Sequence, residues 1–258
     1  MANNSSIEWT EATWNPVAGC SIVSSGCTNC YAMRMAARLE RMGQEKYVNL
    51  TMHSGGKQKW NGRINLDWKA ADLPRKWKKG RLIFVNSMSD LFHKDIPDEF
   101  IQTIFKTMTE TPQHTYQLLT KRAERLLKMN EALTWSENIW MGVSVENREN
   151  TNRIEYLRST GAKVKFLSLE PLIGPLEDLD LNNIDWVIAG GESGPGARAV
   201  DEDWIRVIRD TCQRSFVPFH FKQWGGTNKK ASGRILDGRT WDELPRKAHD
   251  SGYGQSSL

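Results

Sequence analysis

The sequence predicts an α/β fold in which a parallel sheet curls into a βα barrel, complete or partial and TIM-like. From residue 82 onward, short apolar and β-branched segments alternate with longer amphipathic ones. The predicted strands lie within 81–90, 115–122, 138–147, 162–171, 185–194 and 217–226. Apolar runs of this kind are typical of strands buried on both faces, and their alternation with helices indicates a parallel sheet. With a first unit near the N-terminus there are about seven βα units, which favours a barrel over a small doubly wound sheet.

Amphipathic periodicity predicts the helices between these strands. The segment 97–110 begins with Pro97 and two acidic residues, which suit a first helical turn. Its apolar residues form one stripe: Phe100, Ile101, Ile104, Phe105 and Met108. Similar patterns predict helices within 32–42, 149–160 and 201–214, whereas the stretch after Pro171 is too short and too rich in proline and glycine for a full helix. On the helix 201–214, Cys212 is predicted to be a buried apolar residue.

We expect one domain spanning residues 1–258. Residues 43–80 form an insertion after the first βα unit, and residues 227–258 form a C-terminal appendage. Within the appendage, Asp237-Gly238 predicts a tight turn, and the polar end 249–258 is expected to be disordered.

The composition favours a cytoplasmic protein without a membrane segment. No apolar run reaches the roughly 18–20 residues of a membrane helix, and the N-terminal residues lack the pattern of a secretory signal. In the cytoplasm thiols stay reduced, so clustered cysteines indicate metal or redox chemistry. The net charge of +4 and a pI near 8.8 are only weak signs of a polyanionic partner.

A basic segment, 57–81, interleaves Trp60, Trp68 and Trp77 with many lysines and arginines. Such a pattern suits nucleic acid, because cations follow phosphates while aromatic rings stack on bases. It equally suits a solvated connector whose tryptophans pack against the domain. Both interpretations stay open at this point.

Polar side chains gather at the carboxyl end of every predicted strand. In a parallel barrel these ends converge on one face, where barrel active sites lie, so we expect a functional site there. The residues are Asn86, Ser87, Ser89, Asp90, Thr120, Lys121, Arg122, Ser144, Glu146, Asn147, Ser168, Glu170, Glu192, Ser193, Lys222 and Gln223. In the glycine-rich stretch 189–198, Gly190 and Gly191 are expected to let a ligand approach the backbone with Glu192 facing it; the alternative is a simple turn.

Three of the four cysteines, Cys20, Cys27 and Cys30, lie in one Gly- and Ser-rich loop with the spacing Cys-x6-Cys-x2-Cys. We weigh a disulfide, a structural zinc site, a catalytic cysteine and a 4Fe-4S cluster held by three thiolates. A disulfide would leave one thiol over, and structural zinc needs a fourth ligand, such as Cys212 or a histidine. Three thiolates at the barrel's active face match a cluster with one open iron, and zinc is the main alternative.

A βα barrel with three cysteines after its first strand resembles the radical S-adenosylmethionine (radical SAM) superfamily. More specifically, the chain is similar to a phage and prophage family of unknown function with a three-cysteine motif. The matching stretches run from about residue 8 to 241: WNPVAGC, GCTNCYA, LLTKR, GVSVEN, LSLEPL, GGESGPGAR and FKQWGG. Most radical SAM proteins have Cys-x3-Cys-x2-Cys, with an aromatic residue where Asn29 stands here. Their Gly-Gly-Glu motif normally follows the second strand, whereas here it follows a late one.

The resemblance implies that Cys20, Cys27 and Cys30 ligate a 4Fe-4S cluster whose open iron binds SAM. Reduction, by a reductase or a flavodoxin-type donor, would then cleave SAM to a 5′-deoxyadenosyl radical. The residues expected to bind the cofactor are Tyr31, Asn86, Ser87, Arg122, Ser144 and Glu146. Those expected to serve catalysis on the substrate are Lys121, Glu170, Glu192 and Lys222.

The favoured substrate is a nucleic-acid base, in DNA or in a nucleotide. The alternatives are modification of a peptide or small metabolite, and a zinc- or cluster-stabilised nucleic-acid-binding protein without catalysis. A partner protein is also compatible with the sequence.

Overall fold

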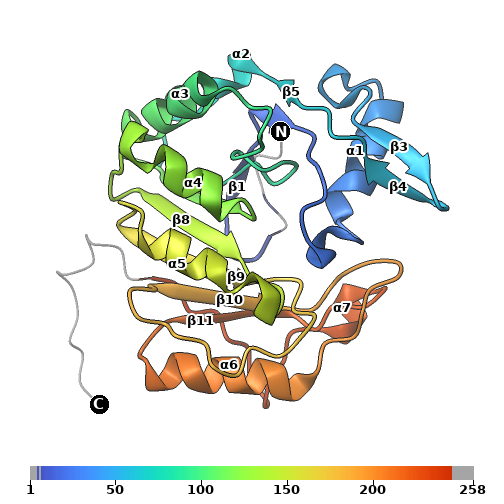
Figure 1. Ribbon diagram of the computed structural model, residues 1–258, viewed down its shortest axis with the longest axis vertical. Coiled ribbons are helices and arrows are strands. Elements are labelled where there is room, and N and C mark those ends of the chain that lie inside the picture. The colour runs from blue at the N-terminus through green and yellow to red at the C-terminus, as the bar shows by residue number, and fades with distance from the viewer. Residues whose placement is uncertain (1–4, 6, 246–258) are drawn as a thin grey trace.

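The computed structural model describes residues 5 and 7–245, and its centre is a curved sheet of seven parallel strands (Figure 1). The strands are β1 (Ala12–Trp14), β6 (Leu82–Val85), β7 (Thr115–Thr120), β8 (Ile139–Ser144), β9 (Val164–Leu169), β10 (Trp186–Gly190) and β11 (Phe219–Gln223). They pair in their chain order, so the winding never reverses as it does in a doubly wound sheet. Within the described residues no ladder joins β11 to β1. The fold is therefore a partial βα barrel, which confirms the predicted class.

The longer helices cover the outer face of the sheet (Figure 1). They are α1 (Tyr31–Arg41), α3 (Asp98–Thr109), α4 (Ala123–Met129), α5 (Asn152–Arg158) and α6 (Glu202–Arg214), with short α2 (Trp68–Ala71) and α7 (Lys229–Ser232). Single 3-10 turns lie at Ser25–Cys27, Glu45–Tyr47, Leu73–Lys76, Asn130–Ala132 and Arg148–Asn150. The predicted apolar stripe of α3 is buried throughout. Cys212, on the buried side of α6, is also buried as expected. Residues 170–185 contain no helix, also as expected.

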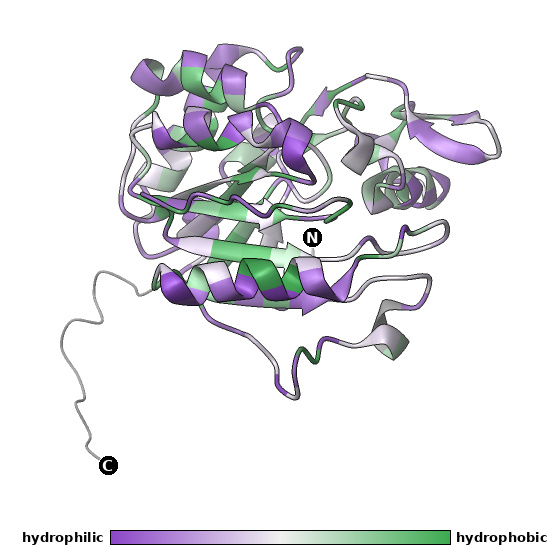
Figure 2. Ribbon diagram, turned by 60° about the horizontal axis from the view of Figure 1, so that its bottom comes forward, coloured by the Kyte–Doolittle hydropathy of each residue, from purple (hydrophilic) through white to green (hydrophobic). Residues whose placement is uncertain are grey.

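Side chains alternate between two apolar layers along the strands, as the two-residue period of a strand requires. Ile83, Val85 and Leu118 belong to the large core beneath the helices. On the concave side lies a smaller aromatic cluster, made of Trp9, Phe84, Trp140, Phe166, Trp186 and Ile188. Figure 2 shows hydrophobic residues along the central strands and hydrophilic residues on the outer sides of the helices. The barrel interior is thus filled by aromatic rings at one level.

The insertion contributes strands to two small antiparallel sheets, and its β3–β4 hairpin lies beside α1 (Figure 1). One is the hairpin of β3 (Thr51–Ser54) and β4 (Lys57–Trp60), and the other pairs β5 (Asn65–Leu66) with β2 (Val17–Ala18). Leu50 and Trp60 pack with Met33 of α1 in a separate apolar cluster. The hairpin of the insertion is therefore attached to the first helix, and the later part of the insertion packs against the main core.

The tryptophans of the basic segment pack on the protein. Trp60 is buried, and Trp77 packs against the main core with the Arg81 guanidinium above its ring. Trp68 is 50% exposed but meets Phe100 edge to face. This packing favours the connector interpretation for the tryptophans.

The appendage contains the predicted tight turn. Leu236 and Arg239 form a bridge, and Asp237 and Gly238 between them both have positive φ, 50° and 81°. Two consecutive left-handed residues define a type I′ turn, which Asp-Gly favours. The disorder expected for 249–258 lies outside the described residues.

None of the described helices is both long enough and apolar enough to cross a membrane.

Candidate functional site

The cysteine loop, residues 19–30, lies across the carboxyl ends of the parallel strands. It leaves β2, forms a bridge between Gly19 and Ser89 beyond β6, and enters α1 at Tyr31. The Tyr31 hydroxyl donates to the Ser87 carbonyl across 2.5 Å, which joins the start of α1 to the end of β6. Three groups of polar contacts hold the rest of the loop to the ends of β6–β7, β8 and β10.

Arg122, just after β7, makes the first attachment. Its Nη1 donates to Asp90 Oδ2 at 2.8 Å and lies 3.7 Å from Cys20 Sγ. Its Nη2 donates to both the carbonyl and the hydroxyl of Ser21, at 3.1 and 2.9 Å. The Ser21 hydroxyl also contacts Nε2 of the fully buried His93 at 2.8 Å. One guanidinium therefore fixes the loop at its first cysteine.

Two thiols of this loop, those of Cys20 and Cys30, have raised pKa values. Burial, and after it the Asp90 carboxylate, raise the pKa of Cys20 to about 12, although Arg122 opposes the shift. Burial likewise raises the pKa of Cys30. A metal that binds these thiols as thiolates must displace their protons, which makes its affinity depend on pH.

Glu146, two residues beyond β8, makes the second attachment and is fully buried. Its Oε1 accepts from Ser24 Oγ at 2.6 Å and from Lys121 Nζ, and its Oε2 accepts from Arg153 Nη1 at 2.7 Å. A Cβ on Gly26 would lie 2.5 Å from Oε1, so only glycine lets the loop approach this closely. Burial raises the pKa of Glu146, but Lys121 and Arg153 outweigh it and hold that pKa below its ordinary value. The ionised carboxylate is thus occupied by the protein's own donors.

Glu192, beyond β10, makes the third attachment. Arg198 donates to both oxygens of its carboxylate, from Nε to Oε2 at 2.9 Å and from Nη2 to Oε1 at 2.6 Å. The same Nη2 donates to the Ser25 carbonyl at 3.0 Å. Burial opposes ionisation of Glu192, but the Arg198 hydrogen bonds hold its pKa below the ordinary value. The Gly-Gly-Glu stretch is therefore tied to the cysteine loop through Arg198.

Asn29 occupies the junction of three segments. Its Nδ2 donates to Glu192 Oε2 at 3.0 Å and to the Gly196 carbonyl at 2.9 Å. Its Oδ1 accepts from Lys57 Nζ, in the β3–β4 hairpin, at 3.0 Å. A phenylalanine at this position could make none of these bonds. The polar residue before Cys30 thus connects the loop, the hairpin and the segment after β10.

The concave face between these attachments carries buried polar atoms without protein partners. Among the described residues, Asn86 Nδ2 and Glu170 Oε1 are buried and have no hydrogen bond. The other Glu170 oxygen accepts from Lys222 Nζ at 3.0 Å, and Asn86 Oδ1 accepts from the Val17 amide at 3.3 Å. Ser144 is buried at the end of β8. Each of these two unpaired atoms can form a hydrogen bond with a ligand.

The two glycines before Glu192 make room for the protein itself, which corrects our expectation that they admit a ligand. A Cβ on Gly190 would lie 2.7 Å from Glu170 Oε1, and one on Gly191 would lie 2.1 Å from the Trp224 carbonyl. Their small size therefore allows β10 to approach β11 and the Glu170 side chain.

The three loop cysteines form a donor set that fits a three-thiolate cluster. All are free and partly buried in the same loop, whereas Cys212 is sealed in the core beneath α6. Cys212 is therefore no candidate for a fourth ligand beside them. Among the described residues, no three His, Cys, Asp or Glu side chains already stand in the arrangement of a metal site. To hold a cluster, the three cysteine side chains of this loop would have to turn toward one another.

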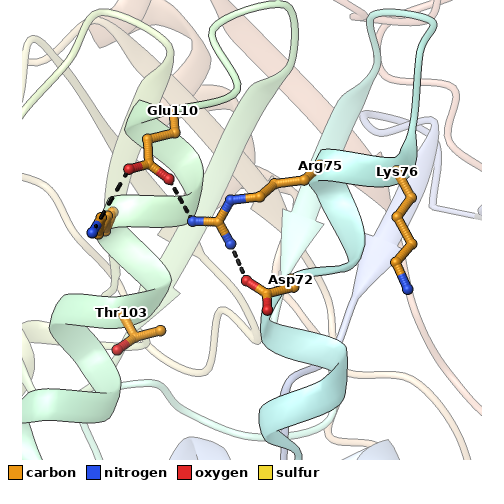
Figure 3. Close-up of a pocket in the computed structure, with 6 residues that line it drawn as sticks. Asp72, Arg75, Lys76, Thr103 and Glu110 are labelled. Atoms are coloured by element: carbon orange, nitrogen blue, oxygen red, sulfur yellow. Dashed lines mark hydrogen bonds and ion pairs between the residues drawn. The ribbon is translucent and has the colours of Figure 1, made fainter.

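A surface hollow that is separate from these residues is shown in Figure 3. It is lined by Asp72, Arg75, Lys76, Thr103, Lys106 and Glu110. Arg75 points between Asp72 and Glu110 and pairs with both. Its charged groups largely satisfy one another, and it contains none of the predicted site residues.

The site also contains residues that sequence patterns did not single out. Ser24, Arg153 and Arg198 are of this kind, and each contacts a predicted site residue or the cysteine loop. Asn29 and His93, which the sequence had already marked, make such contacts as well. Arg198 belongs to the GGESGPGAR stretch and Asn29 to the GCTNCYA stretch, so motif membership was an available signal. Arg153 lies within an ordinary amphipathic helix, and its sequence context offered no such signal.

Comparison with known proteins gives a family but no activity. The profile of a family described as "Protein of unknown function (DUF5131)" matches residues 4–245. No functionally curated protein matches the sequence. The fold was also compared with solved structures. Spore photoproduct lyase complexed with dinucleoside spore photoproduct has a TM-score of 0.38 and 13% identity, covering 75% of this chain and 58% of that one.

Two further structures of spore photoproduct lyase are similar at the same level. A double mutant with bound AdoMet and dinucleoside spore photoproduct has a TM-score of 0.39 and 12% identity, covering 77% of this chain and 59% of that one. A point mutant has a TM-score of 0.44 and 11% identity, covering 81% and 75%. The chain thus spans less than two thirds of the length of the first two structures, and likeness at this level assigns no activity.

Proposed function

This chain belongs to the DUF5131 family of proteins of unknown function, and we propose that it is a 4Fe-4S enzyme of the radical SAM type. The observation that carries the proposal is the position of the three free cysteines. They lie in one loop, held across the carboxyl ends of the strands of a partial βα barrel. Active sites of parallel barrels lie at this face.

Cys20, Cys27 and Cys30 would hold the cluster. When bound, such a cluster supplies the electron that cleaves SAM to a 5′-deoxyadenosyl radical. The cofactor's chemistry is demanding, so the protein's contribution is binding, orientation and exclusion of water.

The unpaired atoms of the concave face would bind the methionyl end of SAM. Asn86 Nδ2 is a donor suited to its carboxylate, and Glu170 Oε1 is an acceptor suited to its ammonium group. This assigns Glu170 to the cofactor, with Lys222 fixing its other oxygen. Ser144, Ser87 and Tyr31 stay candidates for contacts with the rest of the cofactor.

The charged residues that tie the loop down would act by positioning. Glu146, Arg122 and Glu192 each direct their polar atoms to the loop or to an oppositely charged partner. Lys121 neutralises Glu146 at the same place. Together they would hold the cysteine loop over the carboxyl ends of the strands.

The substrate we propose is a nucleic-acid base, in a strand or as a nucleotide. Modification of a peptide or small metabolite is the second possibility within the same chemistry. A zinc- or cluster-stabilised nucleic-acid-binding protein without turnover is the competing class. A reductase or flavodoxin-type donor, a phage origin and a cytoplasmic location stay predictions.

Anaerobic reconstitution tests the proposal. Wild-type protein should bind about four irons per chain, and a variant with Ala at positions 20, 27 and 30 should bind none. Cys212→Ala is the matched control, because it removes a thiol from the core and should leave iron binding unchanged. The reconstituted protein should form 5′-deoxyadenosine from SAM under reduction, measured with and without DNA.

Each of the other outcomes would support a different interpretation of this protein. Equal iron in the triple variant would refute the cluster. Zinc in place of iron would favour the binding protein, and iron without any 5′-deoxyadenosine would favour a cluster that only stabilises the fold.

A further inference from the structure

A basic pocket of about 650 Å³ lies between α4, α5 and the segment after β6. Its cationic lining residues are Lys94, Lys121, Arg122, Arg125, Lys128 and Arg153, and its lining carboxylates are Glu124 and Glu149. Four of these cations also pair with carboxylates behind the lining: Lys121 and Arg153 with Glu146, Arg122 with Asp90 and Arg125 with Asp98. None of the three cysteines lines it. The hollow of Figure 3, in contrast, balances three cations against two carboxylates. Converging cations in a concave site are typical of anion recognition.

Arg153 is the most informative residue of this pocket. It is only 7% exposed, and its Nη1 donates to the Ser144 carbonyl and to Glu146 Oε2, both at 2.7 Å. A guanidinium has five N–H donors, so three remain, on Nε and Nη2. Within the described part of the chain these three have no hydrogen-bond partner. These donors are not among the fully buried unpaired atoms of the described residues, so they are accessible at the pocket that Arg153 lines and can donate to an acceptor there.

Two lysines at the rim can add charge to such an acceptor. Lys94 is exposed and forms no ion pair or hydrogen bond with any described residue. Lys128 pairs with Glu124 at 2.7 Å, but both side chains are about 70% exposed, so that pair costs little to break. Asn152 and Tyr156 supply neutral polar surface beside them.

We propose that this pocket binds a phosphate group of a nucleic acid strand or a nucleotide. The Arg153 fork matches the oxygens of a phosphate, and Lys94 and Lys128 match its remaining charge. The volume also admits the sugar and base attached to it. Because Arg153 and Lys121 share Glu146 with the cysteine loop, a bound phosphate lies next to the candidate site. The pocket does not depend on the proposed cluster, since no thiol contributes to it.

Binding assays with a matched charge control test this site. The probes are a fluorescent single-stranded oligonucleotide, a nucleoside monophosphate and inorganic phosphate. The variant Lys94→Gln/Lys128→Gln should bind the oligonucleotide about tenfold more weakly. Its log–log salt slope should fall by about 0.7, the value for one lost phosphate contact on a single strand. The control, Lys76→Gln/Lys106→Gln, removes the same charge at the hollow of Figure 3 and should bind as wild type does.

A second variant addresses the guanidinium. Arg153→Lys keeps the charge beside Glu146 but loses the fork, so it should weaken phosphate binding while the protein stays folded by circular dichroism. Binding of the oligonucleotide alone would identify a phosphodiester as the ligand, and equal binding of the monophosphate a phosphomonoester. Unchanged binding in the Lys94/Lys128 variant, an equal loss in the control, or no binding of any probe would overturn the proposal.

Discussion

Ser24 Oγ donates a hydrogen bond to Glu146 Oε1 across 2.6 Å and joins the cysteine loop to the end of β8. Two residues further on, Gly26 lies so close to the same carboxylate that no side chain fits between them. Both residues belong to the six that separate Cys20 from Cys27. The unusual length of this gap therefore lets the loop reach Glu146, just beyond the end of β8.

Replacing Glu146 with glutamine should destabilise the protein. Lys121 and Arg153 would lose their shared counter-charge in a buried place, and breaking a buried pair in this way costs about 3 kcal/mol. Urea unfolding of Glu146→Gln measures the change in the free energy of unfolding. Glu149→Gln removes an exposed carboxylate three residues away and should change that free energy by less than about 0.5 kcal/mol. Equal stability of the two variants would show that Glu146 holds nothing in place.

Replacing Ser24 with alanine should loosen the loop more than it destabilises the fold. The lost hydrogen bond is worth about 1 kcal/mol, and it is the only side-chain bond from Ser24 to the sheet among the described residues. Amide hydrogen exchange should quicken at Cys27, whose N–H donates to the Ser24 carbonyl. Ser25→Ala, at the exposed neighbouring position, is the control and should leave this exchange unchanged. Identical rates in both variants would contradict the attachment.

Adding a methyl group at position 26 should strain the same contact. A Cβ there would meet Glu146 Oε1 at 2.5 Å, so Gly26→Ala should cost about 1–3 kcal/mol of stability. In a Glu146→Asp background the carboxylate is one methylene shorter, and the cost of Gly26→Ala should shrink. A double-mutant cycle from denaturant unfolding measures this coupling. Strictly additive effects would mean that the two residues do not meet.

Stability should decrease as the pH falls because of His220. The ring is buried, and neither ring nitrogen has a hydrogen bond among the described residues. Burial, and after it the Arg234 guanidinium, lower its pKa to about 4, while Asp242 opposes them. Between pH 6.5 and about 4 the unfolded chain binds a proton that the folded chain does not. The contribution of His220 is therefore full above pH 6.5 and decreases by about 3 kcal/mol by pH 4.

The variant His220→Phe isolates this contribution. It keeps an aromatic ring beside Trp186 and removes the titrating group. Its free energy of unfolding, measured across that pH range, should vary less than that of the wild type. A profile parallel to that of the wild type would show that His220 has the same pKa in the folded and unfolded chains.

The sequence determined the local elements of this fold. All six predicted strands form, and the apolar stripe of α3 is buried where the periodicity placed it. The Asp237-Gly238 turn also forms, because its backbone angles depend on those two residues. Features of this kind follow from neighbouring residues and can be predicted from them.

The common location of the polar strand ends was also predictable. Strands that run parallel and in chain order bring their carboxyl ends to one face. The cysteine loop follows the first of these units, so its position near that face required no knowledge of individual contacts.

Only the tertiary structure decided which polar atoms meet. Ser24 and Glu146 are 122 residues apart, and Asn29 and Glu192 are 163 apart. Periodicity reports how a residue stands on its own helix or strand, but a hydrogen bond depends on the positions of two distant backbones. For the same reason the glycines at 190 and 191, which looked suited to a ligand, proved to accommodate Glu170 and β11. The sequence thus determined the elements and the face on which the site lies, and the packing of those elements determined its contacts.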